Sequence, residues 1–202
     1  MELHTLPLPP LGANCYLLKA TGRSDGLIID PGGASDAVID ACTRLGMTPK
    51  AILLTHGHFD HVGGVSGLLA AFPDLPVYAH AGDVSPVEGQ LTWQSVPSWV
   101  ELHDNDELSL AGIQLQVLHT PGHSKGSVVF RAEDSLFTGD TLFCGSMGRT
   151  DFPGGDAGEM VSSLRRLGEL EGDFTVYPGH DRATTLAAER QHNPYLREAM
   201  AR

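Results

Sequence analysis

The chain has 202 residues, of which 41% are hydrophobic and 19% charged, values typical of a globular protein with one domain or at most two. Its formal charge of −12 argues against nucleic-acid or anionic-membrane partners, and no apolar run reaches the roughly 18 residues needed to cross a bilayer. Three widely spaced cysteines, and an N-terminus without a basic segment and a long apolar stretch, predict reduced thiols and a cytoplasmic location.

Short apolar runs that end in turn residues predict strands at residues 14–18, 27–29, 51–54, 77–79, 113–118, 127–131, 135–138 and 174–177. Helices are predicted between them, at residues 35–45, 61–71, 157–170 and 182–191. The third helix has the clearest start, because Asp156 precedes it and Glu159 follows three positions later, as in a capping box. No linker interrupts the chain, so one domain over residues 1–202 is predicted, with helices on the outer faces of sheets.

The stretch THGHFDH, residues 55–61, follows the apolar run AILL and crowds four potential metal ligands into six positions. Three later predicted strands also end in a ligand-type residue, within TPGH, TGD and PGH. Together these residues form what we call the ligand cluster: His56, His58, Asp60, His61, His123, Asp140 and His180. Imidazoles and carboxylates without a thiolate suit zinc, iron or manganese, and the set is large enough for two adjacent ions. Asp140 is a candidate bridge, because a carboxylate has two oxygens.

The pattern HxHxDH, followed by a distant His, the Asp of TGD and the His of PGH, resembles the metallo-β-lactamase superfamily over nearly the whole chain. The resemblance implies an α/β (α+β) fold, a four-layer αββα sandwich with its site at one edge. It implies two divalent ions, with zinc favoured and iron or manganese as alternatives. The implied ligands are His56, His58 and His123 for the first ion, Asp60, His61 and His180 for the second, and Asp140 as the bridge. Asp30, in LIIDPGG, matches an aspartate that braces the ligand loop from behind.

Within the superfamily, residues 142–156 (LFCGSMGRTDFPGGD) and 119–127 (HTPGHSKGS) are similar to small bacterial glyoxalase II-like hydrolases, which cleave S-lactoylglutathione. This similarity implies that Arg149 binds a glutathione carboxylate, as a planar guanidinium suits, with Lys125 and Arg182 as weaker candidates. These 202 residues are not expected to include the helical C-terminal domain of larger glyoxalase II enzymes. Persulfide dioxygenases carry a similar loop and the same ligands but use one iron, so a persulfide dioxygenase remains an alternative prediction. Lactamases proper usually carry a cysteine where Asp140 stands.

The expected reaction is thioester hydrolysis by a metal-bound hydroxide, in which Asp60 accepts the remaining proton and Asp140 serves the metals. The expected partner is a small glutathione-derived thioester, and the oligomeric state is left open. Three alternatives are a persulfide dioxygenase with a single iron, another ester or lactone hydrolase, and a non-catalytic binding protein on the same fold. Trp93 and Trp99 are candidates to line the pocket or to pack in the core, and Cys144 is expected to be a buried, inert thiol.

Overall fold

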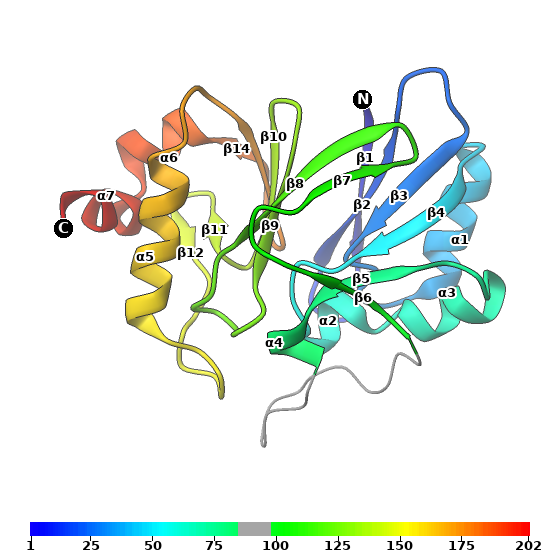
Figure 1. Ribbon diagram of the computed structural model, residues 1–202, viewed down its shortest axis with the longest axis horizontal. Helices are drawn as coiled ribbons and strands as arrows, with labels where there is room; N and C mark the ends of the chain where they lie inside the picture. Colours follow the sequence, from blue (N-terminus) through cyan, green and yellow to red (C-terminus); the bar gives the residue numbers. More distant parts are fainter. Residues whose placement is uncertain (85–97) are drawn as a thin grey trace.

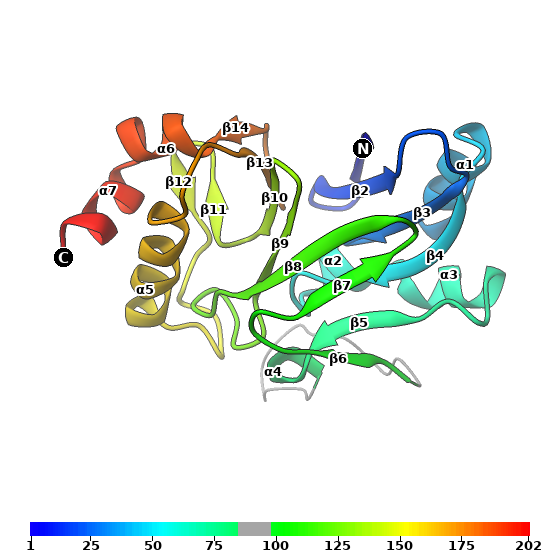
Figure 2. The ribbon, with the colours of Figure 1, turned by 45° about the horizontal axis from the view of Figure 1, so that its top comes forward.

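Two mixed β-sheets, each with six strands, face each other in the residues that the computed structural model describes, 1–84 and 98–202 (Figures 1 and 2). The first sheet has the order β1 (Glu2–Leu8), β2 (Ala13–Lys19), β3 (Asp25–Ile29), β4 (Thr48–Leu53), β5 (Val77–His80), β6 (Val100–Leu102). The second has the order β14 (Thr184–Thr185), β13 (Thr175–Pro178), β10 (Ser135–Gly139), β9 (Val128–Ala132), β8 (Ile113–His119), β7 (Glu107–Leu110). A separate hairpin pairs β11 (Leu142–Phe143) with β12 (Ser146–Met147).

Helices cover the outer face of each sheet. They are α1 (Ser35–Arg44), α2 (Phe59–Val62), α3 (Val65–Ala71), α4 (Ala81–Val84), α5 (Ala157–Gly168), α6 (Leu186–His192) and α7 (Pro194–Ala201). Helices α1 and α3 pack on the first sheet, whereas α5, α6 and α7 pack on the second. In the part of the chain that is described, every helix is too short or too polar to cross a membrane.

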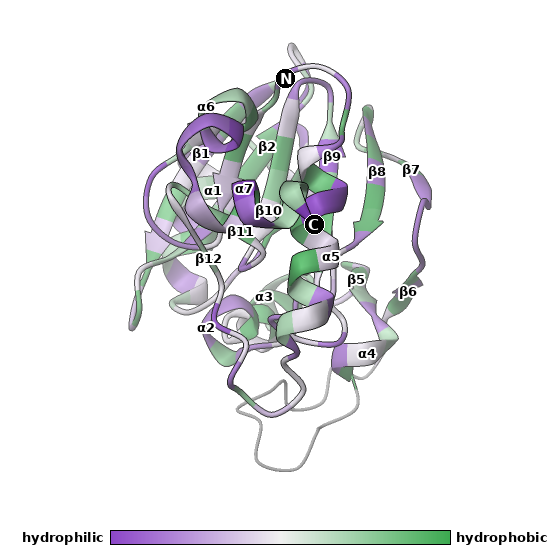
Figure 3. Cartoon of the chain, turned by 90° about the vertical axis from the view of Figure 1, so that its left-hand side faces the viewer, coloured by the Kyte–Doolittle hydropathy of each residue, from purple (hydrophilic) through white to green (hydrophobic). Residues whose placement is uncertain are grey.

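Alternation along the strands divides the buried side chains into three apolar clusters. In β2, Leu17 packs toward α1 and α3, while its neighbour Leu18 joins the cluster between the sheets. In β9, Phe130 enters that central cluster, while Val129 packs toward the helices of the second sheet. Both faces of the central strands are therefore buried, which explains why they read as continuous apolar runs. Helix α5 instead mixes apolar and polar residues, seen in Figure 3 as alternating green and purple. The predicted αββα sandwich is confirmed.

Each of the predicted strands overlaps a strand of the structure, but two predicted helices differ from it. The helix predicted at 61–71 is divided into α2 and α3 at Gly63 and Gly64. The helix predicted from residue 182 begins only at Leu186, since Thr184 and Thr185 pair with β13 instead. The predictions also missed the edge strand β1, whose Pro7 obscures its pattern, and α7, which begins with Asn193 as N-cap and a proline at its first position.

The start of α5 uses half of the predicted capping box. The Asp156 carboxylate accepts hydrogen bonds from the backbone N–H groups of Gly158 and Glu159, at 2.7 and 2.8 Å. The N–H of Asp156 itself donates to the carbonyl of Gly122 at 2.8 Å, in the loop that carries His123. The cap therefore joins α5 to one of the loops of the ligand cluster.

Replacing this cap should cost measurable stability. We expect Asp156→Ala to lower the free energy of unfolding by about 1 kcal/mol, because two N–H groups of the first turn lose their acceptor. Asp156→Asn keeps an acceptor oxygen and should cost only a few tenths of that amount. Urea unfolding followed by circular dichroism measures both, and equal losses would mean that the charge of Asp156, not its capping bond, is what stabilises the helix.

Candidate metal centre

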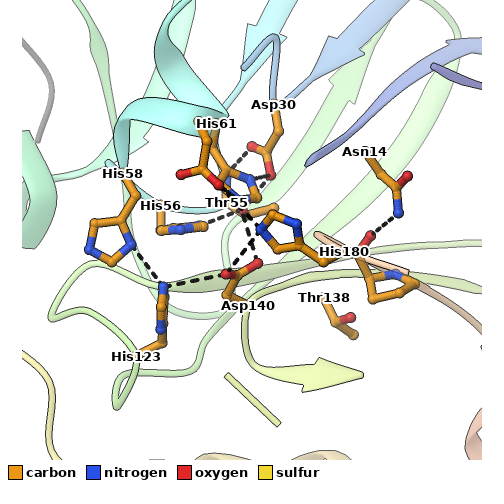
Figure 4. A network of polar contacts seen from close by, with 12 residues as sticks. Asn14, Asp30, Thr55, His56, His58, His61, His123, Thr138, Asp140 and His180 are labelled. Atoms are coloured by element: carbon orange, nitrogen blue, oxygen red, sulfur yellow. Dashed lines mark hydrogen bonds and ion pairs between the residues drawn. The ribbon is translucent and has the colours of Figure 1, made fainter. Parts of the chain in front are cut away.

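The ligand cluster assembles where strands of both sheets end. His56, His58, Asp60 and His61 follow β4, and His123 lies in the loop between β8 and β9. Asp140 directly follows β10 and His180 follows β13, its parallel neighbour. Figure 4 shows this edge from close by, with the side chains of His56, His58, His61, His123, Asp140 and His180 gathered there. Six of the seven residues are buried and His180 is half-buried.

Two triads of ligand atoms can be separated within the cluster. His56, His58 and His123 form the first triad, and Asp60, His61 and His180 form the second; in each, the ligand atoms lie within 4.8 Å of one another. In the first triad, Nδ1 of His58 lies 2.8 Å from Nε2 of His123. In the second, Nε2 of His180 lies 3.2 Å from Oδ2 of Asp60. These two groups have the same members as the ligand sets that the family resemblance implies.

The Asp140 carboxylate lies between the two triads. Its Oδ2 is 3.5 Å from Nε2 of His123, in the first triad, and 3.6 Å from Nε2 of His180, in the second. Its Oδ1 is 3.5 Å from Nε2 of His61, also in the second triad. The approach is close because residue 179 is glycine: a Cβ there would stand 2.2 Å from Oδ1 of Asp140. The position of Asp140 is the one a bridging carboxylate requires.

Hydrogen bonds behind the histidines fix which ring nitrogen faces the centre. The hydroxyl of Thr55 donates to Asp30 at 2.6 Å, so it can only accept from Nδ1 of His56, at 3.1 Å. Nδ1 of His61 donates to the same Asp30 carboxylate at 2.9 Å, and Nδ1 of His123 donates to the carbonyl of Arg149 at 2.7 Å. Each of these three rings therefore turns Nε2 toward the centre, the nitrogen that binds a metal when the ring is neutral.

The residues present fit a pair of divalent cations. Nε2 of His56, Nε2 of His61 and Oδ1 of Asp140 are buried and have no hydrogen-bond partner among the residues that the structure describes. Buried polar atoms are nearly always paired, and these three all point inward from an imidazole and carboxylate set that suits zinc, iron or manganese. In a third group, Asp30, His56 and His61, the ligand atoms also lie within 4.8 Å of one another. Its Asp30 oxygens, however, are engaged by Thr55 and by His61 Nδ1, so Asp30 orients ligands instead.

Protonation in the two triads differs. Burial, and then the neighbouring histidines, lower the pKa of His56, and burial with His123 lowers the pKa of His58 to about 4, so both are neutral at pH 7. Burial also opposes the charged form of His61, but the carboxylates of Asp140, Asp30 and Asp60 outweigh it and raise its pKa to about 9. The first triad is therefore ready to bind a cation, whereas the second must exchange a proton for it.

Close packing brings Asp30 to the back of the cluster. The backbone of Gly32 lies so near Asp60 that a Cβ would stand 1.5 Å from the carbonyl oxygen of Asp60. Any side chain at residue 32 would push the two loops apart and lengthen the bond from Asp30 to His61. Gly32, in the PGG segment that follows Asp30, thus allows the loop of Asp30 to pack against the loop of Asp60 and His61.

Asp83 is a positioning residue that the sequence analysis missed. It is buried in α4, and its carboxylate accepts from the N–H of Gly57 at 2.8 Å and from the N–H of Gly126 at 2.7 Å. The hydroxyl of Ser124 donates to it at 2.7 Å. Gly57 lies between His56 and His58, and Ser124 is next to His123, so one carboxylate joins both loops of the first triad. An isolated aspartate in a short helix carries no sequence signal for such a link.

A cavity of about 490 Å³ opens beside the cluster. Five of the seven ligand-cluster residues line it, together with Arg149. The Arg149 guanidinium makes two 2.7 Å hydrogen bonds to the Asp151 carboxylate. The other predicted substrate contacts, Lys125 and Arg182, are not among its described lining residues. Arg182 instead donates to the sulfur of Cys144 at 3.4 Å.

Three further side chains were singled out in the sequence. Cys144 is half-buried, which differs from the burial expected of it, because the β11–β12 turn leaves it at the surface beside Arg182. Trp99 packs against the apolar cluster beneath α1 and α3, which favours core packing over a role in the cavity. Trp93 lies outside the described residues.

Comparison with known proteins gives one matching family model, described as the Metallo-beta-lactamase superfamily, over residues 8–180. An uncharacterized protein of Mycobacterium tuberculosis is 38% identical, with 97% of this chain and 98% of that protein covered. The hydroxyacylglutathione hydrolase GloC of Haemophilus influenzae is 33% identical, with 97% and 98% covered.

Solved structures match over nearly the same length. The BLEG-1 B3 metallo-beta-lactamase superposes with a TM-score of 0.87, at 36% identity, over 96% of this chain and 99% of that chain. TTHA1623, solved in a di-iron-bound form, gives a TM-score of 0.84 at 38% identity over 95% and 99%. ETHE1 from Myxococcus xanthus gives 0.81 at 31% identity over 96% and 84%.

Removing the Asp83 carboxylate should weaken the first triad selectively. We expect Asp83→Ala to lower metal affinity there by roughly 10- to 100-fold, as loss of a residue behind the ligands commonly does, while the second triad keeps its ion. Metal content after dialysis, measured by atomic emission, should then fall toward half of the wild-type value. The matched control is Asp74→Ala, an exposed aspartate away from the loops, which should keep the full content. Full retention by a folded Asp83→Ala protein would contradict the positioning role.

Proposed function

The chain belongs to the metallo-beta-lactamase superfamily, in its glyoxalase II-like part near the persulfide dioxygenases, and we propose that it is a two-metal thioesterase acting on S-lactoylglutathione-type substrates. The observation that carries the proposal is a set of three buried atoms, on His56, His61 and Asp140, that have no hydrogen-bond partner among the described residues and lie in one centre beside a cavity of substrate size. The name of the Haemophilus influenzae relative, hydroxyacylglutathione hydrolase, supports the substrate class.

We assign the first ion to His56, His58 and His123, the second to Asp60, His61 and His180, and the bridge between them to Asp140. Two divalent ions, when bound, supply a water of lowered pKa and polarise a substrate carbonyl. Zinc is our favoured metal. Iron and manganese are alternatives, and the di-iron form of TTHA1623 supports iron in a close neighbour.

The chain's own residues account for orientation and proton transfer. Asp30 holds His61 directly and His56 through Thr55, so neither ring can turn its Nε2 away from the centre. Asp60 lies at the boundary of the cluster and the cavity, where its carboxylate can take up a proton released during attack on the thioester. Arg149 lines the same cavity and is our candidate for the thiol half, once its pairing with Asp151 yields to a substrate carboxylate.

The direct test is release of free thiol from S-D-lactoylglutathione by the metal-loaded protein. We expect turnover that disappears in Asp140→Ala, because that variant loses the carboxylate between the triads. Metal content is measured on the same samples. Metal-loaded wild-type protein that releases no thiol from S-D-lactoylglutathione would overturn the assignment of this substrate.

A second prediction isolates Asp60. We expect Asp60→Asn to lower kcat on the order of 100-fold or more while changing KM far less, because a proton acceptor acts in the chemical step and not in binding. Steady-state kinetics at matched metal content provides the measurement. Equal losses in kcat and in substrate binding would contradict the proton-transfer role.

A persulfide dioxygenase with a single iron is the second candidate, supported by the GRTDF sequence and by the similarity to ETHE1. Oxygen uptake by the iron-loaded protein with glutathione persulfide distinguishes it from the hydrolase. A cytoplasmic location and a single-domain organisation stay predictions.

A further inference from the structure

Exposed apolar side chains gather at the cavity. Six large hydrophobic residues are exposed among those described, and three of them line this cavity: Leu11, Phe59 and Phe152, at 59%, 39% and 39% exposure. Single exposed apolar residues are ordinary, but a concentration beside a reactive centre marks a binding surface. We call these three, with Phe143, Met147 and Pro153, the apolar rim.

The apolar rim is built from separate segments that the fold holds in place. Leu11 lies between β1 and β2, Phe59 begins α2, and Phe143 and Met147 belong to the β11–β12 hairpin. Asn193, at the start of α7, clamps that hairpin by donating to the carbonyls of Phe143 and Ser146, at 3.2 and 2.9 Å. The hairpin that carries Phe143 and Met147 is thus positioned before any ligand arrives, which lowers the entropic cost of binding.

Outside the ligand cluster, the charged residues among those described that line the cavity are Arg149 and Asp181. Arg149 is the only lysine or arginine among the described lining residues. Its guanidinium is paired with Asp151 and its Cζ lies 3.9 Å from the ring centre of Phe152. Apart from the ligand cluster, the surface offered to a substrate is therefore mainly hydrocarbon.

We propose that the apolar rim binds an uncharged hydrocarbon acyl group, so that the preferred substrates are thioesters with longer or aromatic acyl chains. This inference rests on the proposed thioesterase function, which places the thiol half at Arg149 and leaves the remaining walls to the acyl half. A lactoyl group would fill little of a 490 Å³ cavity. In the reaction, the oxygen of water joins the acyl carbon, the C–S bond breaks, and the products are the carboxylic acid and the free thiol.

The first test is a series of glutathione thioesters with acetyl, butyryl, hexanoyl and phenylacetyl groups. We expect kcat/KM to rise by up to about fourfold for each added methylene that becomes buried. Leu11→Ala and Phe59→Ala should flatten this rise, and the use of two variants covers the case in which one of them loses metal. Tyr195→Ala, which removes a hydrophobic side chain that is 43% exposed and away from the cavity, should leave the rise intact.

A binding experiment separates this inference from the proposed function. S-methylglutathione and S-hexylglutathione are not hydrolysed, and we expect calorimetry with metal-loaded protein to show tighter binding of the hexyl compound, with the difference reduced in Leu11→Ala. If thioesters are hydrolysed at rates that do not depend on chain length, and the two ligands bind equally, the proposed role of the apolar rim in acyl binding is wrong. The proposed thioesterase function would still stand. If S-hexylglutathione binds more tightly but no thioester is hydrolysed, the apolar rim does bind hydrocarbon groups and the proposed thioesterase function is wrong.

Discussion

The buried carboxylate of Asp30 is the interaction on which the geometry of the centre depends. It is 1% exposed, and it accepts hydrogen bonds from the Thr55 N–H, the Thr55 hydroxyl and His61 Nδ1. A buried charge is costly unless it is fully hydrogen-bonded, and these three donors meet that condition. The same bonds fix the rings of His61 and, through Thr55, of His56. The Asp30 carboxylate, which lies behind the ligands, thereby orients one histidine from each triad. Asp83 likewise holds the two loops that carry the first triad.

The fold makes this arrangement possible by ending parallel strands at one edge. Asp30 follows β3 and the HGH segment follows β4, its parallel neighbour, while Asp140 and His180 follow the parallel pair β10 and β13 of the other sheet. The apolar cluster between the two sheets holds them together. Cross-links near the site supplement it: Asn14 in the first sheet donates to the carbonyls of Pro178 and Asp181, on either side of His180. Ligands far apart in sequence are thus placed by rigid elements.

The sequence was sufficient for the parts that depend on local pattern or on residue chemistry. Apolar runs located the central strands, and the crowding in THGHFDH with three further strand ends located the whole ligand cluster. Partners that meet only through the fold could not be found in this way. Asp83 reaches two loops that lie more than twenty residues from it in opposite directions, and nothing near it in the sequence indicates that link. Arg149 was found by its motif, but its pairing with Asp151 depends on side-chain conformation.

The central claim is that the ligand cluster holds two ions, one in each triad. A crystal structure of the zinc-loaded protein, with anomalous data collected at the zinc edge, tests it most directly. Two peaks are expected, one about 2.0–2.1 Å from nitrogens of His56, His58 and His123 and the other at similar distances from Asp60, His61 and His180, with Asp140 between them. A single peak in a fully loaded crystal would contradict the two-ion centre.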